Sequence, residues 1–130
     1  MRVTTDIPDE RVAGLLCCGF EGGVGYWCRI IDYREPRKPE PVLDADACVP
    51  LPHIYPHADY PLTGGAVVCH VTDDPDPDDL VLDRAACERG LQLMAEKAPS
   101  HWGDFLAGRE DAVTGDVFIQ LCLLGEVVYG

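Results

Sequence analysis

The amino-acid sequence predicts one α+β domain, in which a small antiparallel sheet of about three strands packs against about three to four helices. Three observations support this fold class. The 130 residues suffice to bury one hydrophobic core but not two, so residues 1–130 are expected to form a single domain. Hydrophobic residues make up 47% of the chain, unlike the composition of a disordered protein. Apolar residues at helical spacing alternate with short runs of strand-forming residues.

The first helix is predicted over residues 8–20. Asp6 lies near the expected N-cap, Pro8 suits the first helical turn, and the acids at positions 9 and 10 favour the positive end of the helix. Glycines at positions 19, 22 and 23 are expected to end it. A strand is then predicted over residues 25–33, which are mostly strand formers.

Residues 34–61 are predicted to form a proline-rich loop within the domain, because seven of the 11 prolines lie there. A connection of this length inside one domain is uncommon and is often functional or mobile. Its histidines, His53 and His57, are four residues apart, a spacing that would place two metal-binding imidazoles on one face of a helix. The prolines around them argue against such a helix.

A β-hairpin is predicted next, with strands over residues 66–71 and 80–82. The connecting sequence DDPDPDD at positions 73–79 is typical of a turn, because proline and aspartate favour turn conformations. The hairpin therefore has an acidic tip, which contains Asp73, Asp74, Asp76, Asp78 and Asp79.

The C-terminal part of the chain is predicted to be helical. Asp83 is expected to cap a helix over residues 84–97, and Ser100 to cap a short helix over residues 101–107. Periodicity does not decide between helix and strand at residues 117–124, but the cap-like segment that begins at Thr114 and the stop at Gly125 favour a helix. The predicted core comprises Leu15, Leu16, Trp27, Ile30, Val68, Leu91, Met94, Phe105, Phe118 and Leu121.

The seven cysteines are predicted to be reduced. Their number is odd, most lie in apolar segments and none forms a Cys-x-x-Cys pair, which argues against a secreted disulfide framework. Reduced cysteines behave as small hydrophobic residues and indicate a cytoplasmic protein. The first ten residues lack the apolar segment of a signal peptide, and no apolar run reaches the roughly 18 residues of a membrane span.

The chain is strongly acidic, with 23 acids, 10 bases and a formal net charge of −13. Residues 66–130 carry −9 of this charge and residues 1–65 carry −4. Such a field either serves solubility alone or attracts basic partners, and it repels nucleic acids and anionic membrane surfaces. The expected partner is a protein with a basic surface; direct binding to nucleic acid or to a membrane is not expected.

No motif identifies a catalytic, cofactor-binding or metal-binding residue, and no cofactor is expected. Cys69 and His70 are adjacent in a predicted strand, so their side chains point to opposite faces. The glycine-rich segment after the first helix precedes a strand, the reverse of a phosphate-binding loop, and the acidic tip lacks the central glycine and final glutamate of an EF-hand. No nucleophile signature surrounds any cysteine. Glu21 is the one acid close in sequence to the aromatic pair Tyr26 and Trp27.

Three stretches share features with known proteins. They are FEGG at positions 20–23 followed by Tyr26 and Trp27, the segment from Leu82 to Met94, and TGDVF at positions 114–118 together with GEVVYG at positions 125–130. Together they resemble a family of small uncharacterised accessory proteins of tailed phages and prophages. The resemblance covers both ends of the chain and skips its proline-rich middle, and it assigns no catalytic residue.

The resemblance implies a phage accessory gene. Small acidic accessory proteins of phages are often inhibitors of host systems, including anti-CRISPR proteins, and many present carboxylates where a nucleic-acid-binding protein expects phosphates. Resemblance and charge together predict a non-enzymatic inhibitor in the host cytoplasm that binds a nucleic-acid-handling or defence complex through the five aspartates of the hairpin tip. The alternatives are a phage structural or assembly factor that forms homo-oligomers, and a small enzyme with a Cys/His site.

Overall fold

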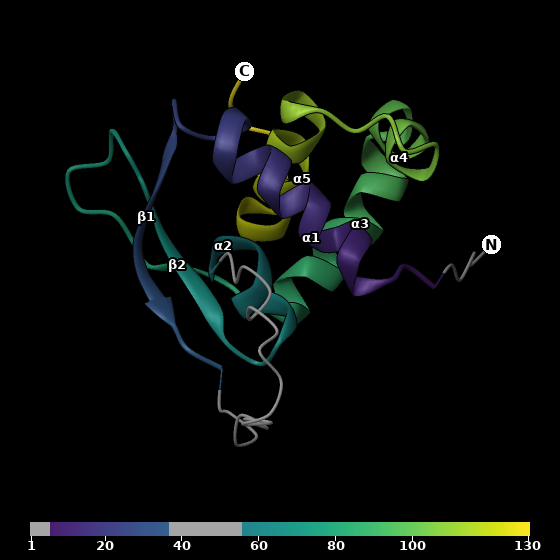
Figure 1. Ribbon diagram of the computed structural model, residues 1–130. Coiled ribbons are helices and arrows are strands. Elements are labelled where there is room, and N and C mark those ends of the chain that lie inside the picture. Colours follow the sequence, from purple (N-terminus) through teal and green to yellow (C-terminus); the bar gives the residue numbers. More distant parts are fainter. Residues whose placement is uncertain (1–5, 37–55) are drawn as a thin grey trace, which may run out of the picture.

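A computed structural model describes residues 6–36 and 56–130. In these ranges the elements are, in order, α1 (Asp9–Cys18), the π-helical η1 (Gly19–Gly23), β1 (Cys28–Arg34), α2 (Pro56–Asp59), the 3-10 turn η2 (Tyr60–Leu62), β2 (Ala66–Val71), β3 (Leu80–Leu82), α3 (Arg84–Lys97), α4 (Pro99–Leu106) and α5 (Ala112–Leu124). Figure 1 shows the sheet on one side of the molecule and the longer helices on the other. The predicted α+β fold class is confirmed.

The sheet has three antiparallel strands in the order β1-β2-β3. Four consecutive buried residues, Ala66–Cys69, explain why β2 occupies the centre. The bounds predicted for β2 and β3 are confirmed, whereas β1 begins three residues later than predicted. Its first predicted residues form a turn instead, in which the backbone N–H groups of Trp27 and Cys28 both donate to the carbonyl of Val24 at 3.0 Å.

Helix α5 lies at the centre of the helical layer and contacts α1, α3, α4, η1 and β3. Its residues 114–122 are all buried, which explains why their apolar run shows no helical periodicity. The predicted helix is confirmed, but its predicted start is wrong. It begins at Ala112, because the Asp111 side chain accepts a hydrogen bond from the backbone N–H of Thr114 at 3.0 Å and caps it there.

The other helix caps are partly as predicted. Asp83 caps α3 by accepting a hydrogen bond from the N–H of Ala86 at 2.9 Å. Asp6 does not cap α1, because Pro8 occupies the N-cap position and no side chain bonds to the helix end. Ser100 does not cap α4, since the helix already begins at Pro99. Gly19 and Gly22 do not end the first helix as predicted, because α1 continues there into the wider π-helical η1.

One part of the predicted proline-rich loop is helical. Residues 56–59 form α2, which is followed directly by η2. Pro56 is the first residue of α2, where a missing N–H costs nothing, so this proline starts a helix. The predicted proline-rich loop at residues 34–61 is therefore wrong over residues 56–61, but the argument against a helix that carries both His53 and His57 is not contradicted, because α2 begins only at Pro56. Residues 37–55, with His53, lie outside the described residues.

The hydrophobic core matches most of the predicted set. Its members Leu15, Leu16, Trp27, Val68, Met94, Phe105, Phe118 and Leu121 are all buried. Ile30 and Leu91 are only partly buried and pack against the edge of the core. Ile30 lies on β1 at the edge of the three-stranded sheet, which explains its lower burial.

Three polar residues of α5 are buried, and two of them, Asp116 and Gln120, link α5 to other segments. The Asp116 carboxylate accepts three hydrogen bonds, from the hydroxyl of Tyr26 at 2.6 Å, from Nε1 of Trp27 at 2.7 Å and from Nε2 of Gln120 at 3.0 Å. Burial of the hydroxyl and this hydrogen bond raise the pKa of Tyr26 to about 12. The acid that contacts the aromatic pair is therefore Asp116 and not Glu21, its neighbour in sequence.

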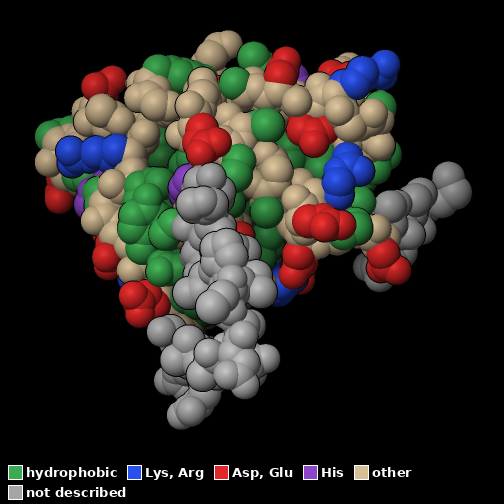
Figure 2. Space-filling model, in the orientation of Figure 1, with side chains coloured by type: hydrophobic (Ala, Val, Ile, Leu, Met, Phe, Trp, Pro, Cys, Tyr) green, Lys and Arg blue, Asp and Glu red, His purple; other side chains and the backbone are tan. Residues whose placement is uncertain are grey.

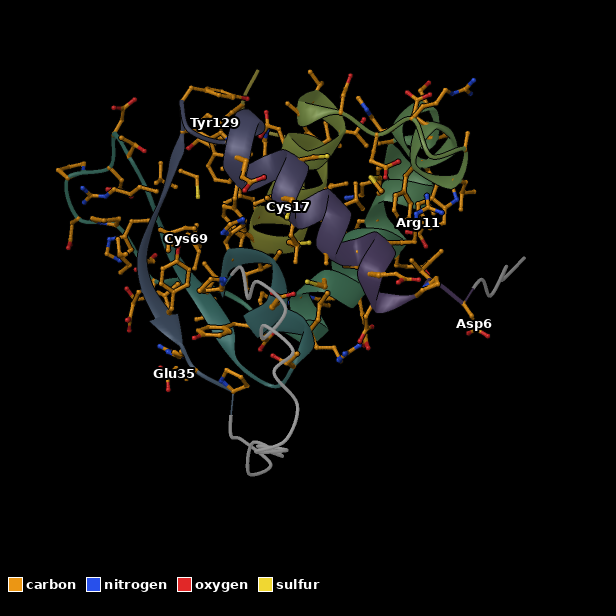
Figure 3. The ribbon with its side chains drawn as sticks, in the orientation of Figure 1. Asp6, Arg11, Cys17, Glu35, Cys69 and Tyr129 are labelled. Carbon is orange, nitrogen blue, oxygen red and sulfur yellow. The ribbon has the colours of Figure 1, made fainter. Side chains whose placement is uncertain are left out.

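Gln120 connects the same network to the C-terminal residues. Its Oε1 accepts hydrogen bonds from the backbone N–H groups of Val128 at 2.8 Å and Tyr129 at 2.9 Å, and its Nε2 also donates to the carbonyl of Tyr129 at 3.1 Å. The Tyr129 ring stacks on Trp27 with centroids 5.1 Å apart. Figure 3 shows Tyr129 beside η1 and the start of β1. Asp116 and Gln120 thus join α5 both to the residues before β1, which are distant in sequence, and to the C-terminal residues that follow α5.

Close backbone contact between η1 and α5 generates a prediction for two helical glycines. A Cβ at Gly115 would lie 2.3 Å from the backbone nitrogen of Gly19. Gly115→Ala should therefore lower the free energy of unfolding by about 1–3 kcal/mol, the usual cost of overpacking. Gly14→Ala in α1 is the matched control: its Cβ meets nothing within 4 Å, and higher helix propensity should stabilise the protein by about 0.5–1 kcal/mol.

Urea unfolding of both variants measures these changes. Equal stability of the two variants would contradict the close contact between η1 and α5.

Candidate functional site

The five predicted partner-binding aspartates lie together on the turn between β2 and β3. The side chains of Asp73, Asp74, Asp76, Asp78 and Asp79 are all exposed. In Figure 1 this turn extends beyond the sheet, on the side away from α3 and α4. The structure therefore gathers all five carboxylates on one exposed feature, which we call the acidic tip (residues 73–79).

Contacts within the described residues engage two of these carboxylates. Oδ1 of Asp74 accepts a hydrogen bond from the backbone N–H of Asp76 at 3.0 Å, which orders the turn. Oδ1 of Asp79 lies 2.7 Å from Nε2 of His70. In the ranges 6–36 and 56–130, no Lys, Arg or His side chain forms an ion pair with Asp73, Asp74, Asp76 or Asp78. Most of the negative charge of the acidic tip is thus balanced only by solvent and its ions.

A second group of chemically active side chains lies where α1, η1 and α2 meet. Sγ of Cys17 in α1 lies 4.0 Å from Nε2 of His57 in α2, and Oε1 of Glu21 in η1 lies 3.5 Å from the same nitrogen. All three atoms lie within 4.8 Å of one another. Figure 3 shows Cys17 on the part of α1 that passes α2. We call these residues the Cys-Glu-His cluster.

Local structure explains how the cluster forms. Cys17 and Glu21 are four residues apart on a helical path that continues from α1 into η1, so they lie on the same side of it. Helix α2 packs beside α1 through the buried Ala58, and the Phe20 ring contacts the His57 ring edge-on with centroids 6.1 Å apart. The His57 side chain is 16% exposed and that of Glu21 57%, so the cluster opens to solvent on the Glu21 side.

Electrostatics hold Cys17 in its protonated form. Burial raises the pKa of the Cys17 thiol, and the negative charges of Glu21 and Asp59 raise it further. A nucleophilic cysteine needs the opposite shift, and in a nucleophile triad the imidazole contacts the nucleophile and the acid through different nitrogens. In the cluster both Sγ and the carboxylate face Nε2 of His57. The arrangement therefore does not match a Cys-His-acid triad.

The Cys-Glu-His cluster could not be predicted from the sequence, because its residues meet only in the folded chain. Cys17 and His57 are 40 residues apart, and their contact depends on α2, which the prolines argued against. The helical spacing of Cys17 and Glu21 is the only local signal for it. The prediction that the side chains of Cys69 and His70 point to opposite faces of their strand is confirmed, since Cys69 is buried whereas His70 contacts Asp79 at the hairpin.

A separate hollow of about 180 Å³ lies between the start of α1 and α3. It is lined by apolar residues such as Val12 and Leu91 and by the ion pair of Arg84 with Asp9, whose two hydrogen bonds are 3.0 and 2.7 Å long. Ligand pockets usually measure about 300–1,000 Å³. Because the hollow is small and its arginine already binds a carboxylate, we assign no ligand site to it.

Comparisons with protein-family models, with curated proteins and with solved structures found no match. The resemblance to phage accessory proteins therefore stays a prediction. Among the helices in the described part of the chain, none combines the length and the apolar character that crossing a bilayer requires. The structure therefore contains two candidate functional sites in its described part, the acidic tip and the Cys-Glu-His cluster.

The electrostatics of the thiols predict slow alkylation. Cys17 and Cys18 are free and partly exposed, and burial with nearby acids raises the pKa of both thiols. A raised pKa keeps each thiol protonated until higher pH, and only the thiolate reacts. With a chelator present, iodoacetamide labelling of both should therefore show a pH midpoint above that of an unfolded peptide of the same sequence, as read by mass spectrometry.

Buried Cys28 serves as the internal control and should react only after unfolding. A midpoint below that of the peptide would show that the folded protein activates these thiols.

Proposed function

We propose that this chain is a non-enzymatic, anti-CRISPR-like binding protein that inhibits a host nucleic-acid-handling or defence complex. In this proposal the acidic tip docks on a basic surface of that complex in the host cytoplasm. The observation that carries the proposal is the exposure of five carboxylates on one turn that extends beyond the sheet. The resemblance to phage accessory proteins supports the host context.

Repulsion within the acidic tip favours a basic partner. Like charges close together destabilise the folded state unless ions or a partner screen them. His70 neighbours Asp79, and the carboxylates of Asp73, Asp76 and Asp78 have no cationic neighbour among the described residues. A row of exposed negative charges also resembles the phosphate backbone that nucleic-acid-binding proteins neutralise with Lys and Arg. Docking would replace repulsion by attraction at several carboxylates at once.

The acidic tip is ordered before any partner binds. Pro75 and Pro77 restrict its backbone, and the hydrogen bond between Asp74 and Asp76 holds the turn. The strands β2 and β3 anchor both of its ends through their pairing from Val67 and Leu82 to Cys69 and Leu80. A segment that is already ordered loses less conformational entropy on binding, which favours affinity.

The net charge of the whole chain also favours association with a basic partner. Residues 66–130 carry −9 of the net charge of −13, and the acidic tip lies among them. Figure 2 shows acidic side chains spread over the visible face with fewer basic ones between them. A field of one sign accelerates encounters with a basic partner and makes association depend on salt.

An assembly factor that forms homo-oligomers is the second candidate. It is favoured by Ile31 and Tyr33 on β1, whose side chains are both 42% exposed at the edge of the three-stranded sheet. Exposed strand edges with apolar side chains pair readily with another chain. Light scattering separates the two candidates, because the inhibitor is expected to be monomeric when its partner is absent.

The central experiment neutralises the acidic tip. Replacing its five aspartates with asparagine should abolish capture of the partner from a host lysate while the unfolding temperature stays close to that of the wild type. Capture by the wild-type chain should weaken steeply as salt rises, because the attraction is electrostatic. The measurement is affinity capture followed by mass spectrometry, repeated over a salt series.

A matched control removes the same charge elsewhere. It replaces five exposed acids outside the acidic tip with their amides, namely Asp6, Glu10, Glu35, Glu88 and Glu126. This control should keep most of the capture, because the position of the charge matters more than its total. If the tip variant captures the partner as well as the wild type does, the acidic tip is only a solvated turn.

A further inference from the structure

The Cys-Glu-His cluster combines three metal-binding atom types that the proposed inhibitor function leaves unused. A sulfur, an imidazole nitrogen and a carboxylate oxygen come from α1, α2 and η1 and lie within 4.8 Å of one another. We propose that Cys17, Glu21 and His57 form a binding site for a divalent transition-metal ion of the zinc type, to which the described residues contribute these three ligands. The site is independent of the acidic tip, which lies on the hairpin.

The distances fit such an ion with small adjustments. Zinc lies about 2.3 Å from a cysteine sulfur and about 2.0–2.1 Å from an imidazole nitrogen, so tetrahedral geometry separates two such ligand atoms by roughly 3.3–3.6 Å. In the protein Sγ of Cys17 and Oε1 of Glu21 lie 4.0 and 3.5 Å from Nε2 of His57. Sγ of Cys17 and Oε1 of Glu21 lie within 4.8 Å of each other. Side-chain rotations that shorten this separation by up to about 1.2 Å bring the three atoms to one centre.

The ligand types select the class of metal. Thiolate and imidazole favour zinc and its borderline-soft neighbours, whereas magnesium and calcium prefer oxygen ligands alone. Three protein ligands are one fewer than the four of a closed structural zinc site. The Glu21 side chain is 57% exposed, so a water molecule can reach the Cys-Glu-His cluster and complete the coordination.

The surrounding charges favour a cation. The cluster contains the carboxylate of Glu21, and Asp59 lies two residues after His57 in α2. Binding of the metal ion replaces the proton on sulfur: the S–H bond breaks, the S–metal bond forms and one proton is released to solvent. The ion thereby brings positive charge to a place where the described side chains supply acids and a thiol.

Cobalt(II) is a direct probe of the proposal, because a thiolate bound to cobalt gives an intense near-ultraviolet charge-transfer absorption that carboxylates do not give. The wild-type chain should bind one equivalent of Co²⁺ with this absorption, and Zn²⁺ should displace it. Cys17→Ser should abolish the absorption, and His57→Gln or Glu21→Gln should weaken metal affinity by at least about tenfold. Because Glu21 is exposed, Glu21→Gln tests the site without endangering the fold.

Neighbouring residues of the same types provide the controls. Cys18→Ser and His70→Gln remove a partly exposed thiol and an imidazole outside the cluster and should leave Co²⁺ binding unchanged. In the wild-type chain, Zn²⁺ should also protect Cys17 from iodoacetamide without protecting Cys18. The proposal is overturned if stoichiometric Co²⁺ gives no charge-transfer absorption, if the absorption persists in Cys17→Ser, or if Zn²⁺ leaves the labelling of Cys17 unchanged.

Discussion

The fold depends on one constraint: α5 carries a carboxylate and an amide into the hydrophobic core, and both need hydrogen-bond partners there. A buried polar group without a partner costs about 1–3 kcal/mol. Asp116 finds its partners in Tyr26 and Trp27 before β1, and Gln120 finds its partners in the backbone of Val128 and Tyr129. Satisfying these two side chains therefore places the turn before β1 and the C-terminal residues against the same helix, and it orients the sheet relative to the helical layer.

Glycines in the stretches for which a resemblance to phage accessory proteins is predicted allow the helices to pack closely. Gly115 permits η1 to approach α5, because any Cβ there would meet the backbone of Gly19. Gly90 of α3 likewise leaves room for Cys122, whose sulfur would lie 2.1 Å from a Cβ at that position. These residues, like the aromatic pair and the polar pair of α5, have structural roles. The acidic tip lies outside the three stretches, so its candidate role rests on its own charge and exposure.

Local signals in the sequence predict the elements but not the contacts between them. The hairpin and the helix capped by Asp83 were predictable, because turn residues and a cap act over a few neighbouring positions. The start of α5 was not, since Asp111 and Thr114 both offer capping side chains and only the folded backbone selects one. The acidic tip could be read directly from consecutive aspartates. The Cys-Glu-His cluster could not, because it requires α2 to bring His57 to residues that lie 40 positions away.

The two candidate features lie on different elements: the acidic tip connects β2 to β3, and the Cys-Glu-His cluster lies on α1, η1 and α2. Asp116 joins α5 to the residues that precede β1. The most direct test is the free energy of unfolding of Asp116→Leu. Its side chain branches at the same carbon but is larger, and it leaves the Trp27 indole N–H and an amide hydrogen of Gln120 unpaired. We expect a loss of at least about 2 kcal/mol, and a smaller loss for Asp116→Asn, which retains an acceptor oxygen. Unchanged or increased stability of Asp116→Leu would contradict the central role of this network.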